Sequence, residues 1–188
     1  MKEHRSLCGT MSATFNGDGG GPDGLGSHRI LLERHISSYA GAAGARRLLT
    51  IGVNPSKASH LKNDNTITKE SKFARAWQMD VLIKANLFGL CSTDPEGLLS
   101  VADPTGDPEN LDAIVREAKR ATIVVACWGG PYGPVALHRL VTRRALQVVC
   151  ALTEASVQLH VLALTKDGIP RHPLYLKDSS TPVLWSAP

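Results

Sequence analysis

The sequence has few of the features that mark metal-binding, secreted or membrane proteins. Its four cysteines (Cys8, Cys91, Cys127 and Cys150) lie too far apart in sequence for the paired spacing of a zinc or iron–sulfur site. No apolar run approaches the roughly 20 residues that a membrane-spanning helix needs, and the N-terminus lacks the hydrophobic region of a signal peptide. We therefore expect a cytoplasmic protein with no metal, cofactor or membrane partner.

Aromatic residues are also scarce, at 5%, whereas 43% hydrophobic and 20% charged residues are typical of a globular protein. A chain of 188 residues can build one domain with a full core but is short for two. The formal charge of +4 and the pI near 9.0 permit a polyanionic partner, although a moderate excess of Lys and Arg is common in proteins that bind none.

The chain divides into an N-terminal segment and one domain. Residues 1–27 contain six glycines between positions 17 and 26 and almost no clustered apolar side chains. Such a segment buries too little surface to offset the entropy lost on ordering, so we predict a flexible tail. Residues 28–188 are predicted to form a single α/β domain.

Apolar, strand-like runs alternate with helix-like segments along this domain. The strand-like runs are residues 30–36, which we expect at an edge, and residues 47–53, 81–90, 121–127 and 157–164. Helical periodicity covers residues 68–78, 109–119 and 134–149. This alternation predicts a three-layer α/β/α fold with a mainly parallel central sheet of about four core strands plus the edge strand.

Four of the predicted strands end in polar or glycine-rich loops. In an open parallel sheet, ligands bind outside the carboxyl ends of the strands, so we expect these loops to form one composite pocket. Their sequences are GVNPS at 52–56, NLFGL at 86–90, WGGPYG at 128–133 and TKDGIPRHP at 165–173.

The first of these loops carries Asn54, whose amide can orient a water molecule or bind the edge of a base. The alternative is that Asn54 forms an Asx-turn within its own loop, as Asn-Pro sequences often do. Ser56 follows as a candidate substrate contact. Asp64 lies further along, before a helix that Asn65 or Thr66 is expected to cap, and it is a candidate catalytic carboxylate.

Two candidates come from the middle loops. Asn86 lies in an apolar strand, where an unpaired amide costs a few kcal/mol, so on energetic grounds we favour a side chain that bonds neighbouring backbone to fix a loop; the alternative is that it faces the ligand. Trp128 ends the most strand-like run of the chain. It could stack on a base, or it could be an ordinary core aromatic.

The last loop has the highest density of functional side chains. Lys166, Asp167, Arg171 and His172 fall within seven positions, and prolines on both sides of the Arg-His pair stiffen the backbone. Arg171 suits a phosphate or carboxylate, whereas His172 suits a developing anion or a proton transfer. The alternative, a solvated charged turn, is disfavoured by the prolines.

These motifs resemble a known family. The succession NPS, NLF-x-L, TDP, ADP-x-G and LTKDG-x-PRHPLYL resembles the bacterial and phage family described as domain of unknown function 1643, and the likeness runs from about residue 30 to residue 185.

A more distant resemblance is to uracil-DNA glycosylase-like proteins, which place a G-x-[NDE]-P motif after the first core strand and a His-Pro or Asn-Pro motif after the last. Residues 52–55 and 172–173 occupy these places here. The resemblance implies that Asn54 positions the attacking water, Asn86 contacts the base and His172 stabilises the departing base. It also implies that Leu174 or Tyr175 replaces a flipped base in the duplex.

The leading hypothesis is therefore a uracil-DNA glycosylase-like protein that recognises a nucleobase or nucleotide and hydrolyses an N-glycosidic bond of a modified or mismatched base. One alternative is a non-catalytic module that binds nucleic acid or a nucleotide at the same loops. Another is an enzyme of free nucleotides, with Lys166 and Arg171 on the phosphate and Asp64 on a metal.

Overall fold

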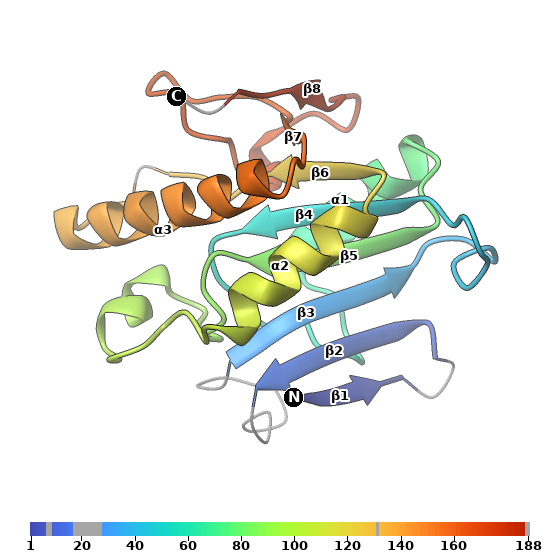
Figure 1. Ribbon diagram of the computed structural model, residues 1–188, viewed down its shortest axis with the longest axis horizontal. Helices are drawn as coiled ribbons and strands as arrows, with labels where there is room; N and C mark the ends of the chain where they lie inside the picture. Colours follow the sequence, from blue (N-terminus) through green and yellow to red (C-terminus); the bar gives the residue numbers. More distant parts are fainter. Residues whose placement is uncertain (7–8, 17–27, 131, 187–188) are drawn as a thin grey trace.

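The computed structural model describes residues 1–6, 9–16, 28–130 and 132–186, whose eight strands form one mixed sheet (Figure 1). The central neighbours β5–β4, β4–β6 and β6–β7 run parallel, whereas β1–β2, β2–β3, β3–β5 and β7–β8 are antiparallel. In spatial order the strands are β1 (Lys2–Arg5), β2 (Met11–Asn16), β3 (His28–His35), β5 (Val81–Asn86), β4 (Arg47–Gly52), β6 (Ile123–Ala126), β7 (Leu159–Val161) and β8 (Val183–Leu184).

Three α-helices of the described residues pack on this sheet, and two short 3-10 helices lie in its loops. The α-helices are α1 (Asn65–Ala76), α2 (Glu109–Arg120) and α3 (Val135–Glu154), and the 3-10 helices are η1 (Pro95–Leu99) and η2 (Pro173–Tyr175). Within the described ranges, none of the helices has the length and apolar character needed to cross a membrane.

The predicted fold class is wrong. The sheet is mixed and mostly antiparallel, and β3, which we expected at an edge, lies between β2 and β5 and is antiparallel to both. An apolar run has the same composition whichever way its neighbour points, so the strand positions could be predicted but their directions could not. The architecture is therefore not a mainly parallel three-layer α/β/α core.

Part of the predicted flexible tail forms strands of the sheet. Residues 1–6 and 9–16, within the segment 1–27, contain β1 and β2, which extend the sheet beyond β3 (Figure 1). Ala13 and Phe15 of β2 are buried there, and these two apolar side chains are too few to predict a strand from composition. The glycine-rich residues 17–27 lie outside the described part of the chain.

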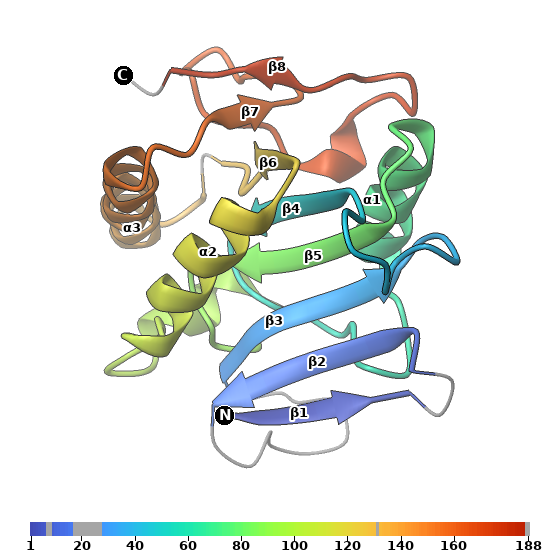
Figure 2. The same cartoon turned by 45° about the vertical axis from the view of Figure 1, so that its right-hand side comes forward.

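Side chains on each strand alternate between two faces of the sheet. Leu82 and Val125 belong to the core under α1, whereas Ile83 and Val124 belong to the core under α2 and α3. Figure 2 shows α2 and α3 on one side of the sheet and α1 on the other. Whether a residue reaches the α1 face or the α2–α3 face is therefore decided by its position along a strand.

The carboxyl ends of the parallel strands meet at one edge. Gly52 at the end of β4 lies opposite Asn86 at the end of β5. Because β3 runs the other way, it begins at this edge, where the backbone N–H of Arg29 donates to the carbonyl of Gly89 at 2.8 Å. The edge thus combines strand ends with the beginning of β3.

Candidate functional site

A polar cavity of about 160 Å³ lies at this edge, on the α1 face. We call it the Asn86 cavity. Five of the predicted site residues line it: Asn54, Ser56, Asp64, Asn86 and His172. The other residues that line it are Arg29, Gly52, Val53, Thr66, Ile67, Lys84, Ser92, Thr93 and Pro95.

Asn86 and Lys84 converge beside Gly52. A Cβ atom at Gly52 would lie 2.8 Å from Asn86 Oδ1 and 2.8 Å from Lys84 Nζ, so only glycine leaves room for both groups. Asn86 is 2% exposed. Its backbone carbonyl accepts a hydrogen bond from Asn110 Nδ2 at 3.1 Å, but its side-chain amide has no hydrogen-bond partner among the described residues. The interpretation we favoured for Asn86, a side chain bonded to neighbouring backbone, is therefore wrong for the described residues.

Lys84 is a buried cation with a buried counter-ion. Its Nζ lies 2.6 Å from Oε1 of Glu70, a residue of α1 that is 1% exposed and also accepts from Thr50 Oγ1 at 3.1 Å. Burial acts to lower the pKa of Lys84, but the attraction of Cys127 and Glu70 outweighs it and raises the pKa above 10.5. Burial raises the pKa of the Cys127 thiol to about 12, so that thiol is neutral at pH 7 and Glu70 supplies the counter-charge.

Asn54 holds two loops together. Its Nδ2 donates to the carbonyl of Ser92 at 2.9 Å and to that of Pro55 at 3.0 Å. The bond to Pro55 lies within the first loop, but it is not the Asx-turn that we considered, in which Oδ1 would accept from a backbone N–H. Asn54 Oδ1 forms no hydrogen bond within the described ranges, which leaves an acceptor at the wall of the cavity.

Asp64 caps helix α1. Its Oδ1 accepts from the backbone N–H of Ile67 at 2.8 Å, so the prediction that Asn65 or Thr66 would be the cap is wrong. An aspartate at this position satisfies a free helix N–H and its charge interacts favourably with the helix dipole. Asp64 also lines the cavity, so a structural role and a chemical role are compatible.

His172 enters the cavity from the last loop as a neutral imidazole. Its Nδ1 accepts from the backbone N–H of Leu174 at 3.4 Å, at the start of η2. Burial and the positive charge of Lys84 lower the pKa of His172 to about 4, against the opposing attraction of Asp64. The proton of the neutral ring is therefore on Nε2, which makes this atom a hydrogen-bond donor.

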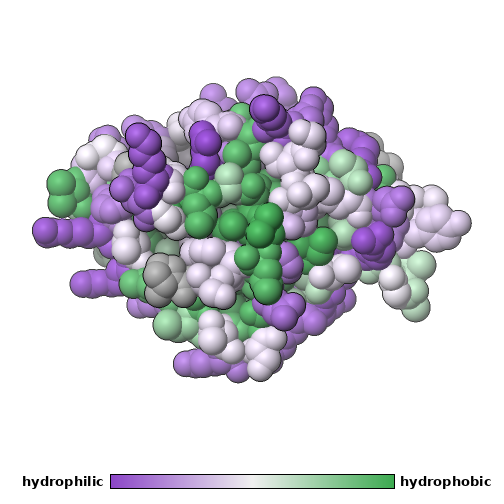
Figure 3. All heavy atoms as spheres, turned by 90° about the horizontal axis from the view of Figure 1, so that it is seen from above, coloured by the Kyte–Doolittle hydropathy of each residue, from purple (hydrophilic) through white to green (hydrophobic). Residues whose placement is uncertain are grey.

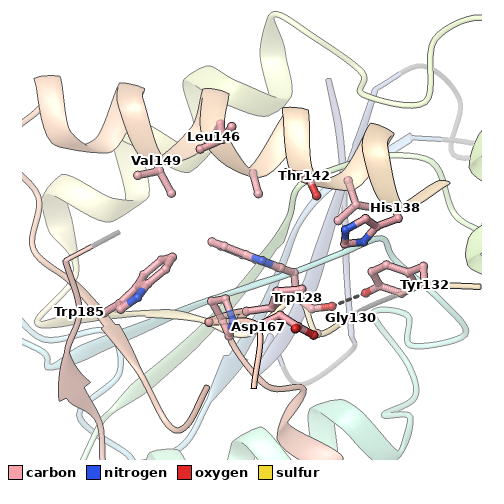
Figure 4. A pocket seen from close by; sticks show the side chains of 15 residues that line it. Trp128, Gly130, Tyr132, His138, Thr142, Leu146, Val149, Asp167 and Trp185 are labelled. Carbon is pink, nitrogen blue, oxygen red and sulfur yellow. Dashed lines mark hydrogen bonds between the residues drawn. The ribbon is translucent and has the colours of Figure 1, made fainter. Parts of the chain in front are cut away.

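Trp128 and Asp167 line a different cavity, of about 190 Å³, between α3 and the last loop (Figure 4). The alternation of side chains explains the separation, because Cys127 points to the α1 face and Trp128 to the α3 face. Figure 4 shows Trp128 and Trp185 facing His138, Thr142, Leu146 and Val149 of α3. We call this the Trp128 cavity, and it is mainly apolar.

The remaining predicted residues line neither cavity. Lys166 and Arg171 are exposed, and Leu174 and Tyr175 are 43% and 75% exposed. Tyr175 contacts the ring of His172 edge-on, with ring centroids 5.9 Å apart. These four side chains surround the loop that carries His172 without entering the Asn86 cavity.

The surface on the side of β8 is partly apolar. Val183 and Leu184 of β8 are 59% and 58% exposed, and Figure 3 shows apolar side chains across the middle of this face.

Sequence reasoning missed Lys84 and Arg29. A single charge inside the apolar run VLIKAN was a usable signal for Lys84, since a charge is rarely placed in a buried strand without a purpose. Arg29 carried no such signal, because regular alternation along β3 would have placed its side chain on the α2–α3 face of the sheet, away from the cavity.

No group of three or more His, Cys, Asp or Glu side chains in the described ranges could hold a metal ion. The Asn86 cavity is lined by two amides, two cations, a carboxylate and a neutral imidazole.

The fold and site define an α/β protein with a mixed sheet and a polar cavity at the edge where the carboxyl ends of its parallel strands meet. Residues 29–174 match the family described as Protein of unknown function (DUF1643), and the chain belongs to that family. Neither curated proteins nor solved structures include a significant match to the chain.

Proposed function

We propose that the Asn86 cavity binds a nucleobase, presented in a nucleotide or a nucleic acid, and that the protein hydrolyses the N-glycosidic bond of that base. The observation that carries this proposal is the amide of Asn86, which is buried, unbonded and directed at the same point as Lys84. An amide offers one donor and one acceptor side by side, which is the pattern needed to pair with the edge of a heterocycle.

The size and polarity of the cavity support a small polar group as the part of the ligand that enters it. Its volume of about 160 Å³ is well below the range of about 300–1,000 Å³ typical of sites for drug-sized molecules. The cation of Lys84 is paired with Glu70, and the free side-chain amide of Asn86 offers a donor and an acceptor. A base with carbonyl and N–H groups meets both requirements.

The same residues suit cleavage of a glycosidic bond. The departing base gains negative charge, which the ammonium of Lys84 and the Nε2–H of His172 can stabilise. The free Oδ1 of Asn54 and the carboxylate of Asp64 are acceptors that can orient an attacking water molecule. In this reaction water adds to the sugar carbon, the bond to the base breaks, and the base leaves with the bonding electrons and then takes up a proton.

The distant resemblance to uracil-DNA glycosylase-like proteins supports the proposal through the positions of individual residues and not through the fold. The two motifs that carry it, at 52–55 and 172–173, contribute Gly52, Asn54 and His172 to one cavity. The proposal does not depend on a shared architecture.

The test is a panel of oligonucleotides that contain uracil, hypoxanthine or hypermodified bases. Binding is measured by fluorescence anisotropy, and abasic sites are detected by strand cleavage in hot alkali. We expect at least one base to be bound and released, and Asn86→Ala to abolish both effects. The control Gln158→Ala removes an exposed amide just before β7, at the opposite end of the parallel strands, and should leave both unchanged.

Absence of binding and cleavage across the whole panel would refute the proposal. Binding without cleavage, still lost in Asn86→Ala, would establish the binding site and refute the hydrolytic step. Equal binding by Asn86→Ala and the unaltered protein would refute the assignment of the cavity.

A further inference from the structure

Three arginines of the described residues are buried to the same extent, with 3% of each exposed. Arg34 donates from all three guanidinium nitrogens to loop and strand oxygens. Arg144 forms a two-pronged ion pair with Asp107 and donates from Nε to a backbone carbonyl. The guanidinium of Arg29, in contrast, forms one hydrogen bond, to the carbonyl of Ala58, and no ion pair within the described part of the chain.

A β-bulge directs Arg29 into the site. In β3, Leu32 belongs to the core under α1, so regular alternation would put Leu31 and Arg29 together on the other face. The register between β2 and β3 shifts here, so that Phe15 lies opposite Arg29 and Ile30 has no partner. Residues directly opposite each other share a face, and Phe15 lies in the core under α1. Bulges next to functional sites often re-aim a side chain in this way.

The guanidinium that results lines the Asn86 cavity without a bonded counter-ion. Burial lowers the pKa of Arg29, and the attraction of Cys91 and Asp64 opposes this effect, but an arginine does not give up its proton in a protein. A buried, permanent charge needs an anionic partner, and its unused N–H donors suit the paired oxygens of a phosphate or carboxylate. The hydroxyl of Ser56, also at the cavity wall, is a further donor.

We infer that Arg29 is the anion-binding residue of the Asn86 cavity and that the ligand is a nucleotide bound through its phosphate, rather than a free base or nucleoside. The inference rests on the proposed function, because a ligand built on a nucleobase carries its anionic oxygens on phosphate. The phosphate belongs either to a free nucleotide or to a nucleic-acid strand.

The first experiment uses inorganic phosphate and needs no knowledge of the base. Thermal unfolding is followed in sodium phosphate and in sodium chloride of equal ionic strength. We expect phosphate to raise the Tm of the unaltered protein and of Arg139→Met, which removes an exposed arginine on α3, but not that of Arg29→Met. A rise of equal size in Arg29→Met would overturn the inference.

The ligand-free proteins separate an anion site from a structural arginine. If Arg29 awaits a ligand, Arg29→Met removes an uncompensated buried charge and should keep or raise the Tm. Arg34→Met, which breaks a saturated set of hydrogen bonds, should lower the Tm. A loss in Arg29→Met as large as that in Arg34→Met would show that Arg29 is structural.

The second experiment compares affinities by isothermal titration for the four nucleosides, their 5′-monophosphates and short single-stranded oligonucleotides. The phosphate should increase the affinity of the unaltered protein by on the order of tenfold to a hundredfold, from charge-assisted hydrogen bonds. Arg29→Met should lose this gain, and Arg29→Lys should recover part of it. Preference for monophosphates or for oligonucleotides then identifies the source of the phosphate.

The two hypotheses fail in different ways. If nucleosides bind through Asn86 but the phosphate adds no affinity, the inference is refuted and the proposed function stands. If phosphate stabilises the protein through Arg29 but no nucleoside or nucleotide binds, the anion-binding role stands, whereas the nucleotide assignment and the proposed function are both refuted.

Discussion

Replacing Glu70 by Gln tests how the buried charge of Lys84, at the Asn86 cavity, is stabilised. The change keeps the shape of the side chain and an oxygen for Thr50, but it removes the counter-charge that lies 2.6 Å from Lys84 Nζ. Breaking a buried ion pair from one side costs about 3–5 kcal/mol. For a chain of this length, where 1 kcal/mol lowers the Tm by about 2–4 °C, the expected fall is about 6–20 °C.

The assays are thermal unfolding for the Tm and urea unfolding for the free energy of unfolding, both followed by circular dichroism and applied to Glu70→Gln, Lys84→Met and the double variant. Because the double variant contains no unpaired buried charge, it should be less destabilised than the sum of the single variants, with a coupling of a few kcal/mol. The raised pKa of Lys84 means that its contribution is complete below pH 10.5 and is lost only as the pH rises further. In Glu70→Gln, burial acts on Lys84 without the attraction of Glu70, so the pKa of Lys84 should fall and the penalty should be smaller at about pH 9 than at about pH 7. Additive single-variant effects would refute the ion pair as the source of stability.

Two further predictions concern the walls of the cavity. The pKa of His172 is lowered from 6.5 to about 4 in the folded protein, so the unfolded chain takes up this proton first and the stability should fall as the pH drops from about 6.5 to about 4. In His172→Phe, a plot of Tm against pH should lose this part of its slope. An unchanged slope would contradict a buried neutral imidazole. Because Asn also caps helices well, Asp64→Asn should leave the Tm nearly unchanged, whereas Asp64→Ala should cost about 1 kcal/mol of stability. Loss of base release in both variants would assign a chemical role to the carboxylate. Full activity in Asp64→Asn would restrict Asp64 to capping the helix.

The positions of the central strands could be predicted from the sequence because each is an apolar run bounded by turn residues. Residues 47–53 and 81–90 contain β4 and β5, and residues 121–127 contain β6. The directions of the outer strands could not be predicted, because they depend on pairing between distant segments. The N-terminal hairpin shows this most clearly, since β1 is mostly exposed and the buried residues of β2 belong to a core that is built mainly by later segments of the chain.

The candidate site was predictable where it depended on strand ends and unpredictable where it depended on side-chain direction. Asn54, Asn86 and His172 follow or end strands that meet at one edge, and all three line one cavity. Trp128 also ends at this edge, but it lies one position past Cys127 and therefore points to the α3 face. One residue along a strand is enough to move a side chain to the other side of the sheet.

Arg29 and Lys84 indicate a ligand site more strongly than the residues in the recognisable motifs do. Loop residues such as Asn54 can be explained by loop structure alone, because the Asn54 amide holds two backbone carbonyls. A cation inside a strand has no such explanation, since burying it costs free energy that a Leu or Val would not. Lys84 needs Glu70 to remain charged, and Arg29 needs a bulge to reach the cavity at all. Gly52 then leaves the space in which Lys84 and Asn86 meet. Each of these features costs free energy locally, and a polar ligand in the cavity would offset that cost, so the proposed binding function depends on these strand residues more than on the motifs.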